Sequence, residues 1–245
     1  MAGAGFAAAK TAGCAVSISV IIPALNEAES IGAVVQSMPW SDIAECIVAD
    51  NGSTDATAEI AREAGARVIV SPRGYGAAMS AGVKAAVGDV LVFLDGDGAD
   101  PVEEMVRIAG PVLRGEADLV LASRIMGKRE PGSMQASQVF AGHLIGWMVR
   151  VFYGFRYTDM CAFRAIRRET LEQMRMTEMT FGWNLEMQIK AVKMGLRVKE
   201  VPVDYRRRIG GESKVSGNLS ASVKAARRIL GVFVRIRKQK QVQNL

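Results

Sequence analysis

The stretch Val90-Leu-Val-Phe-Leu-Asp-Gly-Asp97 places two carboxylates directly after a run of five apolar residues. An apolar run of this length that ends at a turn is typical of a strand buried on both faces of a sheet. Asp95 and Asp97 then lie at the end of that strand, and Gly96 between them makes a turn easy. Carboxylates at positions i and i+2 of such a turn can converge on one hard cation. The stretch therefore predicts a metal site at a sheet edge, the alternative being a turn with solubilising acids.

Short apolar strands and helical patterns alternate on both sides of this stretch. Strands are expected over residues 16–22, 46–49, 67–70, 90–94, 119–122, 160–166 and 197–201. Helices are expected over residues 27–38, 54–64, 77–86, 102–113, 138–153 and 183–194. This alternation predicts an α/β fold with a doubly wound, mostly parallel central sheet flanked by helices.

The loops that follow successive strands are polar, acidic or rich in glycine: residues 23–27, 50–55, 71–76 and 95–100. The carboxyl ends of parallel strands share one edge of a sheet, and ligands bind there. At such an end Asp50 can accept hydrogen bonds from a nucleobase or a ribose, and Glu27 can do the second; the alternative for Asp50 is a turn and a helix cap. Asn26 and Glu29 fit a capping box, so Asn26 is expected to be structural.

The composition is that of one folded domain. The chain has 245 residues, of which 49% are hydrophobic and 23% charged, which excludes collagen, coiled coil and disorder. Three cysteines, Cys14, Cys46 and Cys161, are odd in number and far apart. No disulfide framework or zinc site is therefore expected, and the cytoplasm is the expected compartment. No window holds 18 uninterrupted apolar residues, so no membrane-spanning segment is expected.

Positive charge is concentrated at the end of the chain. The formal net charge is +6, and residues 206–245 contain eleven Lys and Arg against one acid, Glu212. We expect a disordered leader over 1–15, one main domain over 16–218, and a basic amphipathic helix and tail over 219–245. The apolar stripe of that helix either packs on the main domain or lies on an anionic bilayer, and the sequence leaves both open.

Other functional motifs are not supported by the surrounding sequence. The glycines over 3–8 follow no strand, the stretch Gly74-Tyr-Gly-Ala-Ala lacks a third glycine, and there is no Walker lysine motif. The single histidine, His143, lies in an apolar stretch, where a buried structural role is expected rather than a hydrolase triad. A nucleic-acid-binding tail needs stacking aromatics, and Phe233 alone is aromatic over 206–240, so no nucleic acid partner is expected.

Six short motifs, taken in order, resemble the inverting family 2 glycosyltransferases of the GT-A fold. Within that family they are similar to the dolichyl-phosphate mannosyl- and glucosyltransferases, the polyprenyl-phosphate branch. The motifs are Pro23-Ala-Leu-Asn-Glu27, Asp50-Asn-Gly-Ser-Thr-Asp55, Asp95-Gly-Asp97 with Pro101 and Glu103, Ala122-Ser-Arg124, Asp159-Met-Cys-Ala-Phe-Arg164 and Arg208-Ile-Gly-Gly-Glu-Ser-Lys214. The resemblance spans about residues 16–217 and implies a GT-A domain with a Rossmann-like central sheet.

The resemblance also implies a role for each matching residue. The nucleoside of a UDP- or GDP-sugar would be held by Pro23, Leu25, Glu27 and Asp50. The DXD motif, Asp95 and Asp97, would hold the diphosphate and its Mg²⁺ or Mn²⁺. The donor diphosphate or an acceptor phosphate would be bound by Arg124, Arg208, Ser213 and Lys214.

The acceptor decides whether the reaction needs a base. A polyprenyl or dolichyl phosphate, the acceptor that the branch implies, is already an anion and needs no strong base. A hydroxyl acceptor, on a glycan, a lipid or a small molecule, needs a general base, and Asp159 is the candidate; its alternative role is to anchor the turn that follows it. A lipid acceptor implies peripheral contact with an anionic membrane on the cytoplasmic face.

Two departures from the branch and two rival classes bear on this prediction. Ala99-Asp100 stands where the branch often has Gln-His, which removes a potential ligand, and Cys161-Ala162 replaces Ser/Thr-Gly near the acceptor. A sugar-1-phosphate nucleotidyltransferase would carry a glycine-rich basic loop where residues 23–26 stand. A non-enzymatic basic scaffold that uses residues 206–240 is the remaining alternative.

Overall fold

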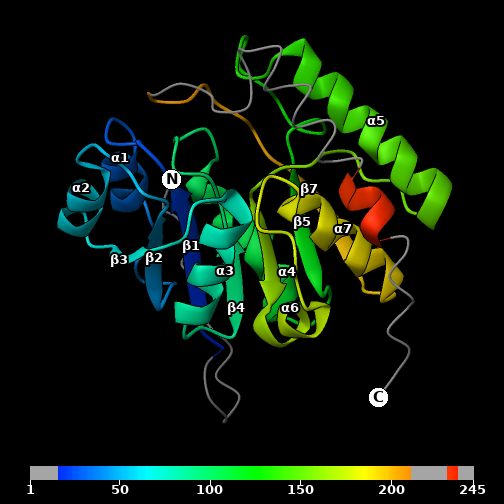
Figure 1. Cartoon of the computed structure of the whole chain (residues 1–245), viewed down its shortest axis with the longest axis horizontal. Helices are drawn as coiled ribbons and strands as arrows, with labels where there is room; N and C mark the ends of the chain where they lie inside the picture. The colour runs from blue at the N-terminus through cyan, green and yellow to red at the C-terminus, as the bar shows by residue number, and fades with distance from the viewer. Residues whose placement is uncertain (1–15, 211–230, 237–245) are drawn as a thin grey trace, which may run out of the picture.

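The computed structural model describes residues 16–210 and 231–236 of the chain. Within these residues the strands form one sheet in the order β3-β2-β1-β4-β6-β5-β7 (Figure 1). The strands are β1 (Ile18–Ala24), β2 (Glu45–Asp50), β3 (Arg67–Val70), β4 (Val90–Phe93), β5 (Leu119–Ser123), β6 (Arg164–Arg167) and β7 (Val198–Pro202). The helices are α1 (Ile31–Gln36), α2 (Thr57–Glu63), α3 (Tyr75–Ala85), α4 (Met105–Leu113), α5 (Ala136–Tyr153), α6 (Arg168–Met174) and α7 (Trp183–Lys193), with a short 3-10 turn η1 (Val102–Glu104) before α4.

The sheet is mostly parallel, as predicted. β1 pairs in parallel with β2 and β4, β2 pairs with β3, and β5 pairs with β7. β6 is antiparallel to both of its neighbours, β4 and β5. Because β5 ends and antiparallel β6 begins at the same edge, the intervening segment with α5 is anchored at that edge. This is also the edge at which β1, β2 and β4 end.

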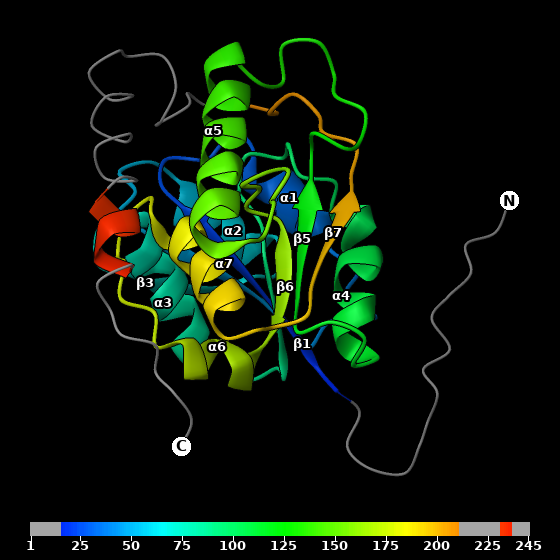
Figure 2. The same cartoon turned by 90° about the vertical axis from the view of Figure 1, so that its right-hand side faces the viewer.

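Helices cover both faces of the sheet (Figure 2). Val90 and Val92 of β4 pack in a core with α1, α2 and α4, whereas Leu91 and Phe93 pack in a second core with α3, α5, α6 and α7. All four residues of β4 are buried, as the apolar run predicts, because successive side chains of a strand point to opposite faces. None of the helices in the described residues has the length and the hydropathy to cross a membrane.

Three elements differ clearly from the prediction, and one of them, α1, begins at Ile31, four residues later than expected. The strand expected over 160–166 begins only at Arg164. The Arg164 side chain is fully buried and donates hydrogen bonds to the carbonyls of Cys161 and Ala162. These two carbonyls therefore accept from a side chain, and the strand begins after them. Helix α6, which follows β6 directly, was not predicted from the sequence pattern.

Residues 231–236 form a helical segment that packs beside α5 and α7. Val232, Phe233 and Ile236 are buried there, and the Phe233 ring meets the rings of Phe152 and Tyr153 edge-on at 5.3 and 5.5 Å. Within these six residues, the buried side chains pack on the main domain. The rest of the helix and tail expected over 219–245 lies outside the described residues, as does the leader expected over 1–15.

We expect Phe233→Ala to lower the free energy of unfolding by about 3 kcal/mol, because it leaves a cavity between two aromatic rings. Val234→Ala is the matched control in the same segment: Val234 is 53% exposed, so the change is expected to cost under about 0.5 kcal/mol. Urea unfolding of both variants measures the difference. Equal losses would contradict the packing described for residues 231–236.

Candidate active site

Three aspartates converge in the turn that follows β4. The backbone N–H of Asp95 donates to Asp100 Oδ2 at 3.1 Å, and that of Ala99 donates to Asp97 Oδ1 at 2.9 Å. Gly98, with φ +78°, lets the chain fold back so that Asp100 lies beside Asp95. Asp97 and Asp100 are each only 5% exposed. The turn thus concentrates negative charge at the carboxyl end of a fully buried strand.

Burial and the proximity of other carboxylates change the protonation of Asp95 and Asp100. Burial raises the pKa of both Asp95 and Asp100, and the neighbouring carboxylates raise both pKa values further. The described residues contain no group of three or more His, Cys, Asp or Glu side chains arranged to hold a metal ion. A cation here would therefore take one or two carboxylates and complete its shell with ligand phosphates and water, which is how Mg²⁺ is commonly bound.

Arg208 reaches the same acids from the segment after β7. Its Nη2 donates to Asp97 Oδ2 at 2.7 Å, and the N–H of Ile209 donates to the Asp97 carbonyl at 2.9 Å. A Cβ at Gly98 would lie 2.4 Å from Ile209 Cδ1, so a larger residue would have to move the Ile209 side chain, and the positive φ of +78° favours glycine in addition. The structure thus brings Arg208 to the DXD motif. The neighbouring Ser213 and Lys214 lie outside the described residues.

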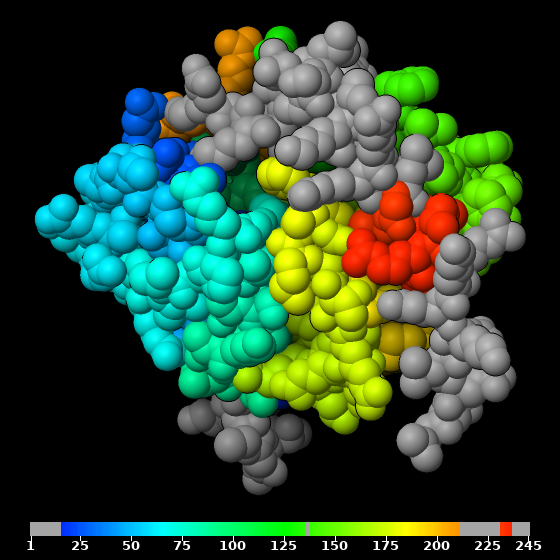
Figure 3. Space-filling view, viewed as in Figure 1, coloured from blue at the N-terminus to red at the C-terminus, as the bar shows by residue number. Residues whose placement is uncertain are grey.

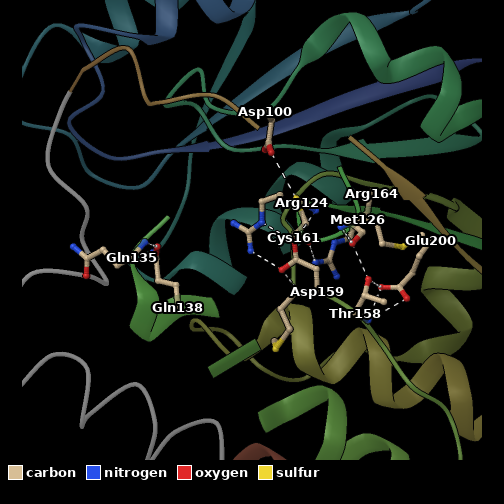
Figure 4. Close-up of polar contacts among 12 residues, drawn as sticks. Asp100, Arg124, Met126, Gln135, Gln138, Thr158, Asp159, Cys161, Arg164 and Glu200 are labelled. Atoms are coloured by element: carbon tan, nitrogen blue, oxygen red, sulfur yellow. Dashed lines mark hydrogen bonds and ion pairs between the residues drawn. The ribbon is translucent and has the colours of Figure 1, made fainter. Parts of the chain in front are cut away.

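Arg124 and Asp159 form a buried, bidentate ion pair (Figure 4). Arg124 Nε and Nη2 donate to the two carboxylate oxygens at 2.7 and 2.8 Å, and the N–H groups of Arg124 and Met160 donate to the same oxygens at 2.9 and 2.7 Å. Burial alone would raise the pKa of Asp159, but the hydrogen bonds and charge of Arg124 outweigh it and hold the pKa below its usual range. This geometry is that of the anchoring role, because both oxygens of Asp159 are already occupied.

The ion pair lies next to the acidic turn. Cys161 Sγ donates to Asp100 Oδ1 at 3.6 Å, and the charge of Arg124 lowers the pKa values of Asp95 and Asp100 against the effect of burial. The ring of Tyr205 packs 5.0 Å from the Arg124 guanidinium carbon. Arg124 thus stands between the acids after β4 and its own partner before β6.

The loops after β1 and β2 are tied to each other. Asn26, at φ +52°, accepts the N–H of Thr54 at 2.8 Å and donates its own N–H to Ser53 Oγ at 3.0 Å. Asn26 is therefore structural, but the expected capping box with Glu29 does not form, because α1 begins later with Ser30 as its N-cap.

The loop after β1 also reaches the acidic turn, and it is tied to the start of α2 as well. The N–H of Glu27 donates to Thr57 Oγ1 at 2.8 Å, and Ser30 Oγ donates to the Gly96 carbonyl at 2.8 Å. Asp50 Oδ1 accepts the N–H of Ser53 at 3.1 Å, as a turn residue does. The predicted residues of this region, Pro23, Leu25, Glu27 and Asp50, therefore all lie at the edge that carries Asp95 and Asp97.

Sequence reasoning missed several residues of this region. Tyr75 donates its OH to Asp95 Oδ1 at 3.3 Å, and Asn51 fixes the 71–76 loop by exchanging two hydrogen bonds of 2.8 Å with the backbone of Gly74. From the sequence, Asp100 is predicted only to lack the ligand function of the family residue at its position. Its position three residues after Asp97, beyond Gly98, was the available signal, since a tight turn there brings it back to Asp95.

Comparison with known proteins gives the family. Residues 19–177 match the family model described as glycosyl transferase family 2. The chain belongs to this family. It is therefore a hexosyl-transferring enzyme, and its sheet and flanking helices are those of the GT-A fold.

Individual relatives support this assignment. The chain is 36% identical over 210 residues to an uncharacterized glycosyltransferase of Mycobacterium bovis, covering 84% of this chain and 93% of the relative. It is 30% identical over 224 residues to an undecaprenyl-phosphate mannosyltransferase of Micrococcus luteus, covering 82% and 88%. A solved structure of Mycobacterium tuberculosis glucosyl-3-phosphoglycerate synthase with Mn²⁺, UDP-glucose and phosphoglyceric acid superposes with a TM-score of 0.72 at 23% identity, covering 89% and 79%.

We expect Asp159→Asn to lower the free energy of unfolding by about 3 kcal/mol, because it leaves the enclosed Arg124 without its carboxylate. Asp118→Asn, which breaks the solvent-exposed pair with Arg197, is the matched control and is expected to cost about 1 kcal/mol or less. The folded pKa of Asp159 lies below that of the unfolded chain, so its contribution is present at neutral pH and is lost as the pH falls through the folded pKa. Similar losses for both variants by urea unfolding at neutral pH would contradict this.

The acidic turn has the opposite pH dependence. Asp95 and Asp100 keep protons to higher pH in the folded state than in the unfolded chain, so they stabilise the fold in acid and lose this effect as the pH rises through the raised pKa values. In EDTA, we expect the free energy of unfolding to fall from about pH 5 to about pH 8, and Asp100→Asn to flatten the fall. Parallel curves for the wild type and the variant would show that the acids are not coupled as described.

Proposed function

We propose that this family 2 glycosyltransferase moves a hexose from a nucleoside-diphosphate sugar to a polyprenyl phosphate. Its cofactor is a divalent cation, Mg²⁺ or Mn²⁺, on Asp95 and Asp97. Support for the donor and the cation comes from the solved relative, whose title names UDP-glucose and Mn²⁺. Burial raises the pKa values of Asp95 and Asp100, and repulsion from the neighbouring carboxylates raises them further. The acidic turn fits such a cation, because bound positive charge would offset both effects.

The donor is assigned to the edge where β1, β2 and β4 end. Pro23, Leu25, Glu27 and Asp50 are proposed to hold the nucleoside, in two loops whose shape is fixed by Asn26. The diphosphate then lies over the turn of Asp95 and Asp97. When bound, the cation neutralises charge on the departing diphosphate.

Cationic side chains of this chain are proposed to bind the phosphates. Arg208 already donates to an anionic oxygen, that of Asp97, so a phosphate oxygen is a chemically equivalent partner. Arg124 uses Nε and Nη2 for Asp159, and within the described residues its Nη1 makes no hydrogen bond. Asp159 is then a positioning residue that holds the guanidinium of Arg124 toward a ligand. Ser213 and Lys214 remain proposed phosphate ligands outside the described residues.

The lowered pKa and the hydrogen bonds of Asp159 are the observation that favours a phosphate acceptor over a hydroxyl acceptor. A hydroxyl acceptor needs a base, but the lowered pKa and occupied oxygens of Asp159 make it a poor one. A phosphate acceptor is an anion that needs no deprotonation. The undecaprenyl-phosphate mannosyltransferase of Micrococcus luteus is a relative whose name carries such an acceptor.

The proposed reaction is a single in-line displacement with inversion. An oxygen of the acceptor phosphate forms a bond to the anomeric carbon while the bond from that carbon to the donor diphosphate breaks. The nucleoside diphosphate leaves with the electron pair, and no proton has to move. Electrostatic stabilisation of the leaving group by fixed positive charge is expected to be the largest catalytic term.

A panel of labelled UDP- and GDP-sugars, offered with a short-chain polyprenyl phosphate or with phosphoglyceric acid, tests the proposal. We expect an acid-labile lipid product that requires Mg²⁺ or Mn²⁺ and is absent in EDTA. Transfer to phosphoglyceric acid alone would contradict the lipid acceptor and would favour the hydroxyl-acceptor alternative that the solved relative represents.

In the same assay, Asp97→Asn is expected to lower turnover at least about a hundredfold, because it removes charge from the proposed cation site. Asp42→Asn, at an exposed aspartate before β2, is the matched control and should leave turnover unchanged. Circular dichroism checks that both variants fold. Wild-type turnover by Asp97→Asn would contradict the assignment of Asp97.

A further inference from the structure

Helix α5 exposes a continuous apolar face. Phe140, Leu144, Trp147 and Val151 are 70%, 45%, 60% and 54% exposed. Their spacing of four, three and four residues places them on one side of the helix. The side chains of α5 lie along the rim of the molecule (Figure 3). Large apolar side chains gathered in this way on a protein surface mark a site of interaction.

The opposite side of α5 is already used by the fold. Ile145 and Val149 are buried in the second core, and a Cβ at Gly146 would lie 2.4 Å from the Tyr157 carbonyl. The orientation of the helix is therefore fixed, and the exposed face cannot turn inward without breaking these contacts. Phe233 adds a further support at the end of α5 through its contacts with Phe152 and Tyr153.

The positive charge around the exposed face of α5 indicates what kind of partner the face can bind. Residues 131–158 contain no Asp or Glu, and the two charged side chains of this stretch, Arg150 and Arg156, are both exposed. Pairing of α5 with the same helix of a second copy would cover Arg150 with no acid of this stretch to meet it, which is costly. Aromatic and aliphatic side chains mixed with arginine instead suit the interface of a bilayer that contains anionic lipids.

We propose that the exposed face of α5 binds the surface of an anionic membrane. This deepens the proposed function, because a membrane-embedded lipid phosphate has to reach Arg124 and Arg208. Arg124 precedes α5 and Asp159 follows it, so the helix is tied at both ends to the edge of the sheet that carries the site. Contact of α5 with the membrane holds that edge close to the lipid headgroups.

Additional positive charge lies before α5. Lys128 and Arg129 are exposed in the loop after β5, and Arg207 packs along this loop, donating from Nε to the Pro131 carbonyl at 2.6 Å. The same loop contains one acid, Glu130, and these three cations outnumber it. Each cation near an anionic surface adds attraction that salt weakens.

Vesicle co-sedimentation of the full chain tests the proposal. The probes are vesicles of phosphatidylcholine alone and of phosphatidylcholine with phosphatidylglycerol. We expect binding to the anionic vesicles that salt weakens, and a loss of at least about tenfold for Phe140→Ser with Trp147→Ser. Val70→Ser with Val87→Ser is the matched control, because these side chains are 81% and 67% exposed elsewhere on the molecule. Equal binding by both double variants would overturn the proposal.

Two further measurements exclude other occupants of the face. Anionic vesicles that contain brominated lipids should quench Trp147 fluorescence more than matched vesicles without bromine. Trp147→Phe should remove that difference. Trp147 shielded from acrylamide without vesicles would overturn the proposal in favour of cover by the chain's own segment. Light scattering that finds a dimer split by the Phe140 and Trp147 substitutions would overturn it in favour of a second copy.

The outcome is separable from that of the proposed function. With a water-soluble short-chain polyprenyl phosphate and no vesicles, the Phe140 and Trp147 double variant should turn over like the wild type, since neither side chain belongs to the site. Vesicle binding through α5 without transfer to any lipid phosphate supports the membrane surface and refutes the acceptor. Transfer to the soluble acceptor with vesicle binding that ignores these substitutions refutes the membrane surface and leaves the acceptor standing.

Discussion

Mutual repulsion among Asp95, Asp97 and Asp100 is the constraint around which this end of the molecule is built. The turn after β4 holds three carboxylates close together, two of them almost fully buried, and charges so placed are costly unless positive charge or protons compensate them. The described residues supply the positive charge from distant parts of the chain, with Arg208 after β7 and Arg124 after β5. The topology makes this possible, because antiparallel β6 carries Asp159 to the same edge and so holds Arg124 in place.

The layered α/β fold was predictable because its cause is local. The buried run before Asp95 and the alternation of strands with helices can be recognised in short segments of the sequence. The end of each parallel strand then gives a position on one shared edge of the sheet. The antiparallel direction of β6 was not predictable in this way, since pairing direction depends on the length and path of the segment that contains α5. The late start of β6 depends on the buried guanidinium of Arg164, a contact that no periodicity records.

The residues of the site differ in the same way: some could be predicted from local sequence, and others depend on distant parts of the chain. Asp95 and Asp97 could be singled out because their chemistry and their place after a strand are both local. The state of Asp159 depends on Arg124, which is distant in sequence, and only the folded chain shows that the ion pair consumes both carboxylate oxygens. Asp100 was missed because its part requires Gly98 to adopt a positive φ, and sequence alone shows the glycine without its conformation.

The contact of Arg208 with Asp97 links two binding events under the proposed function. A cation that takes Asp97 Oδ2 has to displace a guanidinium at 2.7 Å, so the cation alone binds more weakly than its carboxylates would allow. The diphosphate of the donor offers Arg208 a replacement partner. Cation and donor then favour each other, and thermodynamic reciprocity requires that each raises the affinity of the other by the same factor. The enzyme would thus discriminate against either ligand arriving alone.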